Sequence, residues 1–354
     1  MVSATPASKM TYRFLGNSGL LVSKFALGSW MFRDEKNTVD AWYEMMKTAF
    51  SHGVNLFDSA ENYALGRADE LMGGAIQKGI ADGVWSREDL VVTAKIFSGT
   101  KGFTNGTPNS QGLNRKHLIE GTQASLGRMG LEYVDVIFCH HPDAFTPIEE
   151  TVRAMNYIIE QGWAFYWGTS NWSIGEIMEA CEIADRLGLI RPIVEQSQYS
   201  ILERNRVEFE LVDLFSKYKY GITAWSPLAV GTLTGKYSSD IPQGSRMYPE
   251  EMRKGPWGIN FEERVSKADK LKPIAKELGC SLAQLALAWC VKNENVSTVI
   301  IGASRQSQLE ENLAALDVVD KITPDVKAKI DAISDFVPTR PVPDHLRDNR
   351  KRHL

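Results

Sequence analysis

Short apolar runs rich in β-branched residues alternate along the chain with longer segments in which apolar residues recur at helical spacing. This alternation is typical of βα units that build a parallel sheet. Most of the runs have continuous apolar bodies, as strands buried on both faces do. We predict eight strands, at residues 24–30, 54–58, 90–95, 134–140, 164–170, 192–199, 221–226 and 296–304.

Helix-boundary signals fall between these runs. A serine or threonine followed three residues later by glutamate or glutamine forms a capping box, which satisfies unpaired backbone donors. Such boxes predict helix starts at Thr146 (with Pro147 in the first helical position), Ser173, Ser281 and Ser307. Glycines placed just before a predicted strand predict left-handed helix ends at Gly53, Gly162 and Gly221. A stripe of apolar residues between Val39 and Phe50 predicts a helix that packs on the sheet.

Eight βα units in 354 residues match a (β/α)8 TIM barrel, whose typical size is about 250 residues before insertions. Residues 12–15 and 20–24 flank a Gly-Asn-Ser-Gly turn, which predicts an N-terminal β-hairpin that closes the bottom of the barrel. Long loops after strands 3 and 7, at residues 98–112 and 229–260, are expected to be lids or binding loops, or else disordered surface. We expect one α/β domain over residues 11–336, with flexible termini at 1–10 and 337–354.

Composition excludes several classes of protein. The net charge of −4, from 40 basic and 44 acidic side chains, does not indicate a basic surface that binds nucleic acid. We interpret the short basic run at 347–354 as a solvated segment. Four cysteines without CxxC spacing indicate free thiols in a reducing compartment. No run approaches the ~18 apolar residues of a membrane span, and the first residues lack a signal-peptide core. We therefore expect a cytoplasmic protein without membrane insertion.

Polar residues at the ends of the predicted strands carry the candidate chemistry, because barrel active sites lie at the carboxyl ends of strands. Asp58, Lys95 and His140 end three neighbouring runs, and Tyr63 follows Asp58 by five residues. A buried Asp58 needs a cation, which Lys95 on the next strand supplies. The same ammonium favours ionisation of a tyrosine hydroxyl and so makes Tyr63 a better proton donor. With neutral His140 orienting a carbonyl group, the set predicts carbonyl reduction by hydride transfer.

Hydride transfer requires a bound hydride donor, because no side chain supplies a hydride, and the nicotinamide cofactors are the usual source. The GxGxxG fingerprint is absent from the sequence. At the end of the last predicted strand, residues 302–305 (Gly-Ala-Ser-Arg) offer close backbone approach and a guanidinium for phosphate at a helix start. The alternative interpretation is an ordinary capped last helix. A metal site at Cys139, His140 and His141 is not expected, because neighbouring strand residues point to opposite faces.

Six motifs spread over nearly the whole chain carry a family resemblance. They are NLFDSAENYALGRADELMG (55–73), SLGRMGLEYVDVIFCHHPD (125–143), TPIEETVRAMNYIIEQGWAFYWGTSNWS (146–173), EQSQY (195–199), TAWSPLAVGTLTGKY (223–237) and IIGASRQSQLEEN (300–312). In these motifs the chain resembles the aldo-keto reductases, in the branch that contains the cytoplasmic β-subunits of voltage-gated potassium channels. The resemblance implies a catalytic tetrad of Asp58, Tyr63, Lys95 and His140.

The resemblance also implies contacts to NADP(H). Expected contacts are Gly28, Ser29, Trp30 and Asp58, then Ser170, Asn171 and Gln196 near the nicotinamide amide, with Tyr199 stacked on the ring. Around the pyrophosphate they are Trp225, Ser226, Pro227, Leu228, Ala229, Val230, Lys236 and Arg246, and at the adenosine phosphate Gly302, Ser304, Arg305, Gln308, Glu311 and Asn312. The cation at Arg305 favours NADP over NAD. Trp30, Phe97 and Trp172 are expected either to wall the substrate pocket or simply to pack.

Two functions follow from the resemblance. One is an NADPH-dependent reductase of aldehydes and ketones with Tyr63 as general acid; the other is a homotetrameric β-subunit that binds NADP(H) and regulates a voltage-gated potassium channel. The animal channel subunits commonly carry asparagine at the position of His140, whereas active reductases and plant relatives carry histidine, which favours catalysis. A long N-terminal inactivating extension is not expected, because the predicted hairpin begins shortly after Met10. The natural substrate depends on the two long loops and is not predicted.

Overall fold

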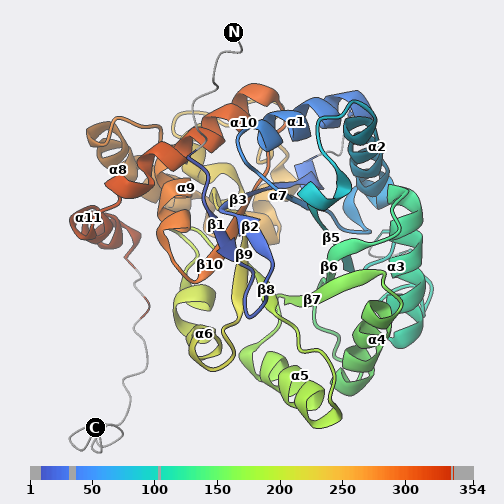
Figure 1. Ribbon diagram of the computed structural model, residues 1–354. Coiled ribbons are helices and arrows are strands. Elements are labelled where there is room, and N and C mark those ends of the chain that lie inside the picture. Colours follow the sequence, from blue (N-terminus) through green and yellow to red (C-terminus); the bar gives the residue numbers. More distant parts are fainter. Residues whose placement is uncertain (1–8, 32–36, 103–104, 336–337, 339–354) are drawn as a thin grey trace, which may run out of the picture.

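A closed barrel of parallel strands forms the centre of the molecule (Figure 1). The structure, a computed structural model, describes residues 9–31, 37–102, 105–335 and 338. Within them, eight strands close in the order β10-β3-β4-β5-β6-β7-β8-β9. Their bounds are β3 Phe25–Gly28, β4 Leu56–Asp58, β5 Val91–Ile96, β6 Val134–Cys139, β7 Ala164–Ser170, β8 Val194–Gln198, β9 Gly221–Trp225 and β10 Val296–Ile301. The predicted (β/α)8 barrel is confirmed.

A two-stranded antiparallel hairpin closes the bottom of the barrel, as predicted. Its strands are β1 Tyr12–Phe14 and β2 Leu21–Ser23. Leu15 and Val22 of this hairpin are fully buried in the apolar cluster inside the barrel. At Gly16 the backbone is left-handed and a Cβ atom would collide with the carbonyl oxygen of Ile193, so only glycine fits this close approach.

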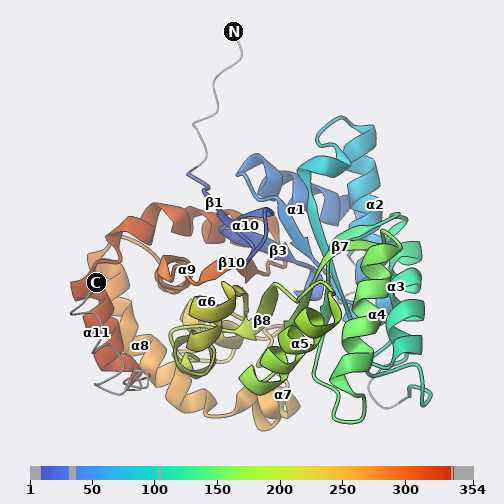
Figure 2. The same ribbon diagram turned by 60° about the horizontal axis from the view of Figure 1, so that its bottom comes forward.

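Helices surround the barrel (Figures 1 and 2). Their apolar faces are buried on the outer side of the strands. On α1, Trp42, Met46 and Ala49 are buried, as the stripe between Val39 and Phe50 predicts. The helices are α1 Val39–Ser51, α2 Arg67–Ala81, α3 Arg115–Met129, α4 Ile148–Glu160, α5 Ile174–Leu187, α6 Val212–Tyr218, α7 Glu250–Lys254, α8 Phe261–Glu277, α9 Leu282–Lys292, α10 Gln306–Leu313 and α11 Pro324–Ser334. Short 3₁₀ turns lie at Ser29–Met31, Tyr63–Gly66, Arg87–Asp89, Ala229–Thr234, Pro256–Gly258 and Ala314–Lys321, and a π turn at Arg206–Glu210.

Two of the four predicted capping boxes are present. The boxes at Ser173, which starts α5, and at Ser281, which starts α9, have both reciprocal hydrogen bonds. The box at Thr146 is wrong, because the Thr146 hydroxyl donates to Asp143 Oδ2 (2.7 Å) and Pro147 occupies the N-cap position of α4 without a capping hydrogen bond. The box at Ser307 is also wrong, because α10 begins earlier, with Arg305 as its cap.

Two of the three predicted left-handed glycines adopt that conformation. Gly53 has φ of 87° and Gly162 has φ of 73°. Gly221 is the first residue of β9 instead, and Lys219, with φ of 51°, turns the chain at the end of α6. The prediction at Gly221 is wrong because the turn occurs two residues earlier.

The two long loops differ in structure. In the segment after β5, the N–H of Gly112 donates to the carbonyl of Phe97 (2.7 Å), which ties the two ends of the loop together. The segment after β9 contains α7 and two 3₁₀ turns, and it has a small apolar cluster of its own, with Val230, Tyr237 and Met247 buried. Residues 1–8, 336–337 and 339–354, which include most of the predicted flexible termini, lie outside the described residues.

The length and hydropathy of the helices in the described residues bear on whether any of them could span a membrane. None of these helices alone is long and apolar enough to cross a membrane. One pair, Pro256–Glu277 with Leu282–Lys292, passes the length and composition test jointly but is bent by 87°.

Candidate active site

The four residues predicted to form the catalytic group come together at the carboxyl ends of the strands. Asp58 ends β4, and Lys95 lies on the adjacent β5. Lys95 Nζ donates to Asp58 Oδ2 (2.5 Å), to the carbonyl of Ser59 (2.7 Å) and to Tyr63 Oη (3.2 Å). The ammonium group therefore bridges the carboxylate and the phenol.

The second carboxylate oxygen of Asp58 is also occupied. It accepts hydrogen bonds from the Thr93 hydroxyl (2.7 Å) and from Gln196 Nε2 (3.1 Å), which reaches across from β8. Sequence reasoning missed Thr93, although it lies two residues before Lys95 and strand periodicity places the two side chains on one face. Both oxygens of Asp58 are thus held, which fixes the carboxylate toward Lys95.

Electrostatics keep Lys95 charged although its side chain is fully buried. Burial favours the neutral amine, but the charge of Asp58 and the Tyr63 oxygen outweigh it, so the pKa of Lys95 is raised above its ordinary value. The Lys95 nitrogen also lies 4.7 Å from the centre of the Tyr63 ring. An ammonium group therefore faces the Tyr63 hydroxyl at neutral pH.

His140 lies on the other side of Tyr63, with the two ring centres 5.8 Å apart and nearly perpendicular. Burial lowers the pKa of His140 well below its ordinary value, and Lys95 and His141 lower it further. His140 is thus neutral at physiological pH. Its Nδ1 atom is buried and has no hydrogen-bond partner within the described part of the chain.

His141 stacks directly on His140, with ring centres 4.7 Å apart and planes at 13°. The expectation that neighbouring residues here point to opposite faces is wrong for this pair, because β6 ends at Cys139. Cys139 itself is buried on the helix side of the barrel. In the described residues no group of three or more histidine, cysteine, aspartate or glutamate side chains is placed to hold a metal ion.

A cavity of about 760 Å³ extends from Asp58, Tyr63 and His140 toward the start of α10. Most of the residues expected to contact the cofactor line it. These are Gly28, Trp30, Asp58, Ser170, Asn171, Gln196, Trp225, Ser226, Pro227, Leu228, Val230, Lys236, Arg246, Gly302, Ser304, Arg305, Gln308, Glu311 and Asn312. Of the remaining three, Ser29 and Ala229 are buried beside the lining, and Ser29 Oγ lies 3.1 Å from Ser59 Oγ.

Tyr199 is the third expected cofactor contact that does not line the cavity. Its predicted stacking on a nicotinamide ring is not consistent with its place in the fold. The Tyr199 side chain is buried in the apolar layer between the barrel and the surrounding helices. Tyr199 Oη donates to Glu208 (2.7 Å), and the ring packs on Trp289 of α9 (5.1 Å). Trp225, at the end of β9, is an aromatic residue of the cavity wall instead.

Aromatic residues form the outer wall of the cavity. Trp257 lies 6.2 Å from Trp30 and 6.0 Å from Trp225, measured between ring centres, and the Arg246 guanidinium lies over Trp30 (4.4 Å). Sequence reasoning missed Trp257, which belongs to the irregular segment after β9. Trp172 is buried outside the lining and packs, while Phe97 contacts the His141 ring at 5.2 Å behind the cavity wall.

Strained backbone gathers in the loops around the cavity. Asn171, Ser226, Ala229 and Val230 all have positive φ, and Val230 is β-branched, which makes this conformation costly. The Ser226 hydroxyl oxygen accepts the Val230 N–H at 2.9 Å and so stabilises this turn. Ser226 and Val230 both line the cavity, so this turn forms part of its wall.

The far end of the cavity is a polar loop at the start of α10. Gln308 Oε1 accepts hydrogen bonds from the N–H (3.1 Å) and the hydroxyl (2.9 Å) of Ser304. Arg305 is exposed and occupies the cap position of the helix. A cation and a helix N-terminus at one place attract anions.

Comparison with known proteins decides the family. The sequence profile of the Aldo/keto reductase family matches residues 24–335. The chain belongs to the aldo/keto reductase family. This result confirms the resemblance read from the six motifs, and it agrees with the barrel and with the placement of the polar side chains at the strand ends.

Relatives of the chain carry channel names. A protein of Arabidopsis thaliana named "Probable voltage-gated potassium channel subunit beta" is 49% identical over 333 residues, which cover 94% of this chain and 99% of the relative. A protein of Oryza sativa subsp. japonica with the same name is 48% identical, over 94% of this chain and 98% of the relative. A Schizosaccharomyces pombe protein named "Putative voltage-gated potassium channel subunit beta" is 44% identical, over 96% of this chain and 98% of the relative.

Proposed function

We propose that this aldo/keto reductase family member is an NADP(H)-dependent reductase that converts aldehydes or ketones to alcohols, with Tyr63 as general acid. The observation that carries the proposal is the contact of Lys95 with both Asp58 and Tyr63 at the floor of the cavity. A buried ammonium beside a phenol assists loss of the phenolic proton, which is the step that carbonyl reduction requires of the protein.

The cavity suits an NADP-type dinucleotide. Its volume of about 760 Å³ lies in the range of ligand sites, and its two ends differ in chemistry. At one end the Gln196 amide donates to Asp58, and Ser170 and Asn171 follow it in a chain of hydrogen bonds. At the other end Arg305 lies beside Ser304. The bound cofactor would supply the hydride, and Arg305 would hold a phosphate of its adenosine part.

The side chains at the near end act on the substrate carbonyl in a fixed order. Neutral His140 and the Tyr63 hydroxyl face the same space, so both orient the carbonyl oxygen by hydrogen bonds. Tyr63 then gives its proton to the developing alkoxide. The Lys95 ammonium, held by Asp58, stabilises the tyrosinate that remains.

Turnover and binding assays together test this function. NADPH oxidation is followed with a reactive aromatic aldehyde such as 4-nitrobenzaldehyde, beside fluorescence titrations with NADPH and NADH. We expect turnover, with tighter binding of NADPH than of NADH. Tight binding of NADPH without turnover would move the assignment to a cofactor-binding subunit, and failure to bind either cofactor would refute both.

The names of the relatives favour a second candidate function. As a β-subunit of a voltage-gated potassium channel, the chain would bind a channel α-subunit and form a homotetramer in the cytoplasm. Its four cysteines, all in the described residues, are free thiols, as a reducing compartment requires. Size-exclusion chromatography with light scattering and co-purification with a channel from the source cell test this function. A strictly monomeric protein would count against it, whereas a tetramer that co-purifies with a channel and turns over aldehydes would combine both roles.

A further inference from the structure

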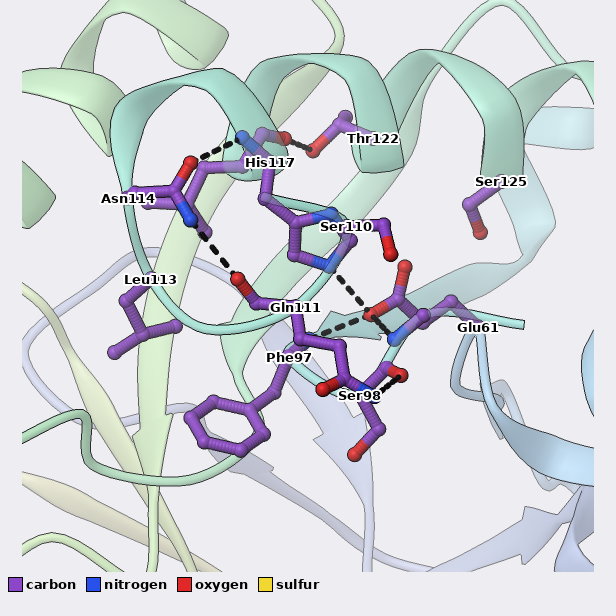
Figure 3. Close-up of polar contacts among 12 residues, drawn as sticks. Glu61, Phe97, Ser98, Ser110, Gln111, Leu113, Asn114, His117, Thr122 and Ser125 are labelled. Atoms are coloured by element: carbon purple, nitrogen blue, oxygen red, sulfur yellow. Dashed lines mark hydrogen bonds and ion pairs between the residues drawn. The ribbon is translucent and has the colours of Figure 1, made fainter. Parts of the chain in front are cut away.

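A buried carboxylate outside the catalytic group makes three hydrogen bonds with one oxygen. Glu61 is 2% exposed, and its Oε1 atom accepts the N–H groups of Phe97 (2.7 Å) and Gly99 (2.8 Å). The same oxygen lies 3.1 Å from His117 Nε2 on α3, so this ring nitrogen donates (Figure 3). Together these bonds join three separate segments of the chain at one atom.

Glu61 lies in the short segment between Asp58 and Tyr63, and its bonds fasten that segment to the chain that follows Lys95. Its own N–H donates to the carbonyl of Lys95 (3.1 Å), while its carboxylate holds Phe97, two residues farther on. The N–H of Tyr63 in turn donates to the carbonyl of Ala60 (3.0 Å). The position of Tyr63 relative to Lys95 therefore depends on the attachment of Glu61.

His117 contacts the Glu61 carboxylate from the side of α3. Its backbone N–H donates to Asn114 Oδ1 (2.9 Å), which caps α3, and the Asn114 side chain donates to the carbonyl of Gln111 (2.9 Å). Gln111 donates to the carbonyl of Ser98 (3.2 Å), so the base of the long loop is tied to the same network (Figure 3). The imidazole thus approaches Glu61 from a fixed helix start.

Close packing of α3 prevents the Glu61 carboxylate from moving away from the barrel. A Cβ atom at Gly121 of α3 would lie 3.1 Å from Glu61 Oε2 and 3.0 Å from the Ile96 side chain. No larger residue fits there without displacing one of the two. The helix is therefore packed directly against the Glu61 side chain, on the side away from the barrel.

We propose that Glu61, held by His117, is a positioning residue that sets the approach of the Tyr63 hydroxyl to the Lys95 ammonium. The inference rests on the reductase function proposed above. Neither Glu61 nor His117 belongs to the cavity lining, so their removal affects proton transfer and not cofactor binding. A displacement of about 1 Å at a catalytic group can cost about 100-fold in rate, so the effect is measurable.

The test uses substitutions at His117, since Glu61→Ala leaves the N–H groups of Phe97 and Gly99 without their acceptor and risks unfolding. His117→Leu removes the donor and keeps the bulk, and His117→Gln returns an N–H group at about the position of Nε2. We expect His117→Leu to lower kcat about 10- to 100-fold, with NADPH affinity unchanged within about twofold. His117→Gln should recover most of the lost kcat.

A matched control separates positioning from general stability. At the opposite end of β5, Asp135 accepts the N–H of Val92 (2.7 Å) and pairs with Arg87 (2.8 Å). Asp135→Asn therefore weakens a similar buried carboxylate bridge on the same strand, far from the chemistry. It should lower the urea midpoint and leave kcat unchanged. A folded His117→Leu protein with wild-type kcat, or an equal loss of kcat in Asp135→Asn, would overturn the proposal.

A second readout does not require turnover. Ultraviolet difference titration of the protein without cofactor, with Tyr63→Phe as the reference, reports the pH at which Tyr63 ionises. His117→Leu should shift that ionisation to higher pH, since Tyr63 moves away from Lys95. An unshifted titration contradicts positioning even if the wild-type protein proves inactive. Absence of wild-type turnover together with the expected shift would refute the proposed function alone.

Discussion

The amino group of Lys95 lies 3.2 Å from the hydroxyl oxygen of Tyr63, although 32 positions separate the two residues in the chain. Lys95 is fully buried, and Asp58 at 2.5 Å balances its charge. Because the pKa of Lys95 is raised against the effect of burial, the charged amine persists where a neutral one would be expected from burial alone. The proposed acid chemistry of Tyr63 depends on this charge.

Replacement of the lysine tests the pair directly. Lys95→Met leaves Asp58 buried without its cation, which should lower the free energy of unfolding by about 3–5 kcal/mol. Addition of Asp58→Asn removes the unpaired charge and should recover part of that loss, without recovery of turnover. Urea unfolding and turnover of the single and double variants measure both effects. A double variant that turns over aldehydes would contradict the role of the ammonium.

Cofactor preference should depend on Arg305. Arg305→Ala removes the exposed cation at the cap of α10 and should weaken NADPH binding by about 10- to 100-fold, because a charge-assisted hydrogen bond contributes about 1.5–3 kcal/mol. NADH binding should change little. Fluorescence titration measures both constants, and Arg153→Ala, an exposed arginine on α4 outside the lining, is the control. Equal losses for the two cofactors would place the phosphate elsewhere.

Buried histidine should make stability pH-dependent. The pKa of His140 in the folded protein lies well below 6.5 because the ring is buried, with Lys95 and His141 adding to the effect. Below pH ~6.5 the unfolded chain binds a proton that the folded chain does not, so the free energy of unfolding falls as the pH falls. Above that pH the contribution is complete. His140→Gln should therefore show a smaller loss of stability than the wild type between about pH 7 and pH 5.5 in urea unfolding.

Part of the pH dependence of stability that remains in His140→Gln is due to His141, whose pKa is lowered by burial and by Lys95. The double variant His140→Gln, His141→Gln should therefore be flatter than the single one. If His140→Gln and wild type have the same pH dependence, His140 is not held neutral in the folded protein.

Two helix glycines should respond in opposite directions to alanine. A Cβ at Gly73 of α2 would collide with the carbonyl oxygen of Met129 at the end of α3, so Gly73→Ala forces the two helices apart and should be strongly destabilising. At Gly127 of α3, no described atom lies within 4 Å of the added Cβ, so Gly127→Ala should stabilise by about 0.5–1 kcal/mol. Thermal unfolding of both variants checks the packing of α2 on α3. A tolerated Gly73→Ala would mean that the helices are farther apart.

Most of the strands were predictable because they have a continuous apolar body, and the predicted run at 164–170 coincides with β7. Helix starts were less predictable, because a threonine at capping-box spacing from a glutamate can bond to another residue instead of capping the helix. Asp143 takes the Thr146 hydroxyl, so no local pattern reveals that the box is absent.

The polar residues that end strands could be selected from the sequence because strand ends and side-chain alternation place them together. Glu61 and His117 could not, since the contact joins residues 56 positions apart and neither ends a strand. Trp257 was missed for a related reason, because it lies in an irregular segment whose path over the cavity no periodicity describes. Tyr199 was misplaced because its motif gives the residue types but not the face on which each lies.

The most direct test of the account compares wild-type protein with Tyr63→Phe in NADPH-dependent reduction of 4-nitrobenzaldehyde, with NADPH affinity measured on the same samples. The phenylalanine keeps the ring beside Lys95 and His140 and removes only the proton donor. We predict that the wild type turns over and that Tyr63→Phe loses about 10²- to 10⁴-fold in kcat, with NADPH binding unchanged. Equal turnover by the two proteins, or tight NADPH binding by a wild type that reduces no aldehyde, would contradict the central role of Tyr63.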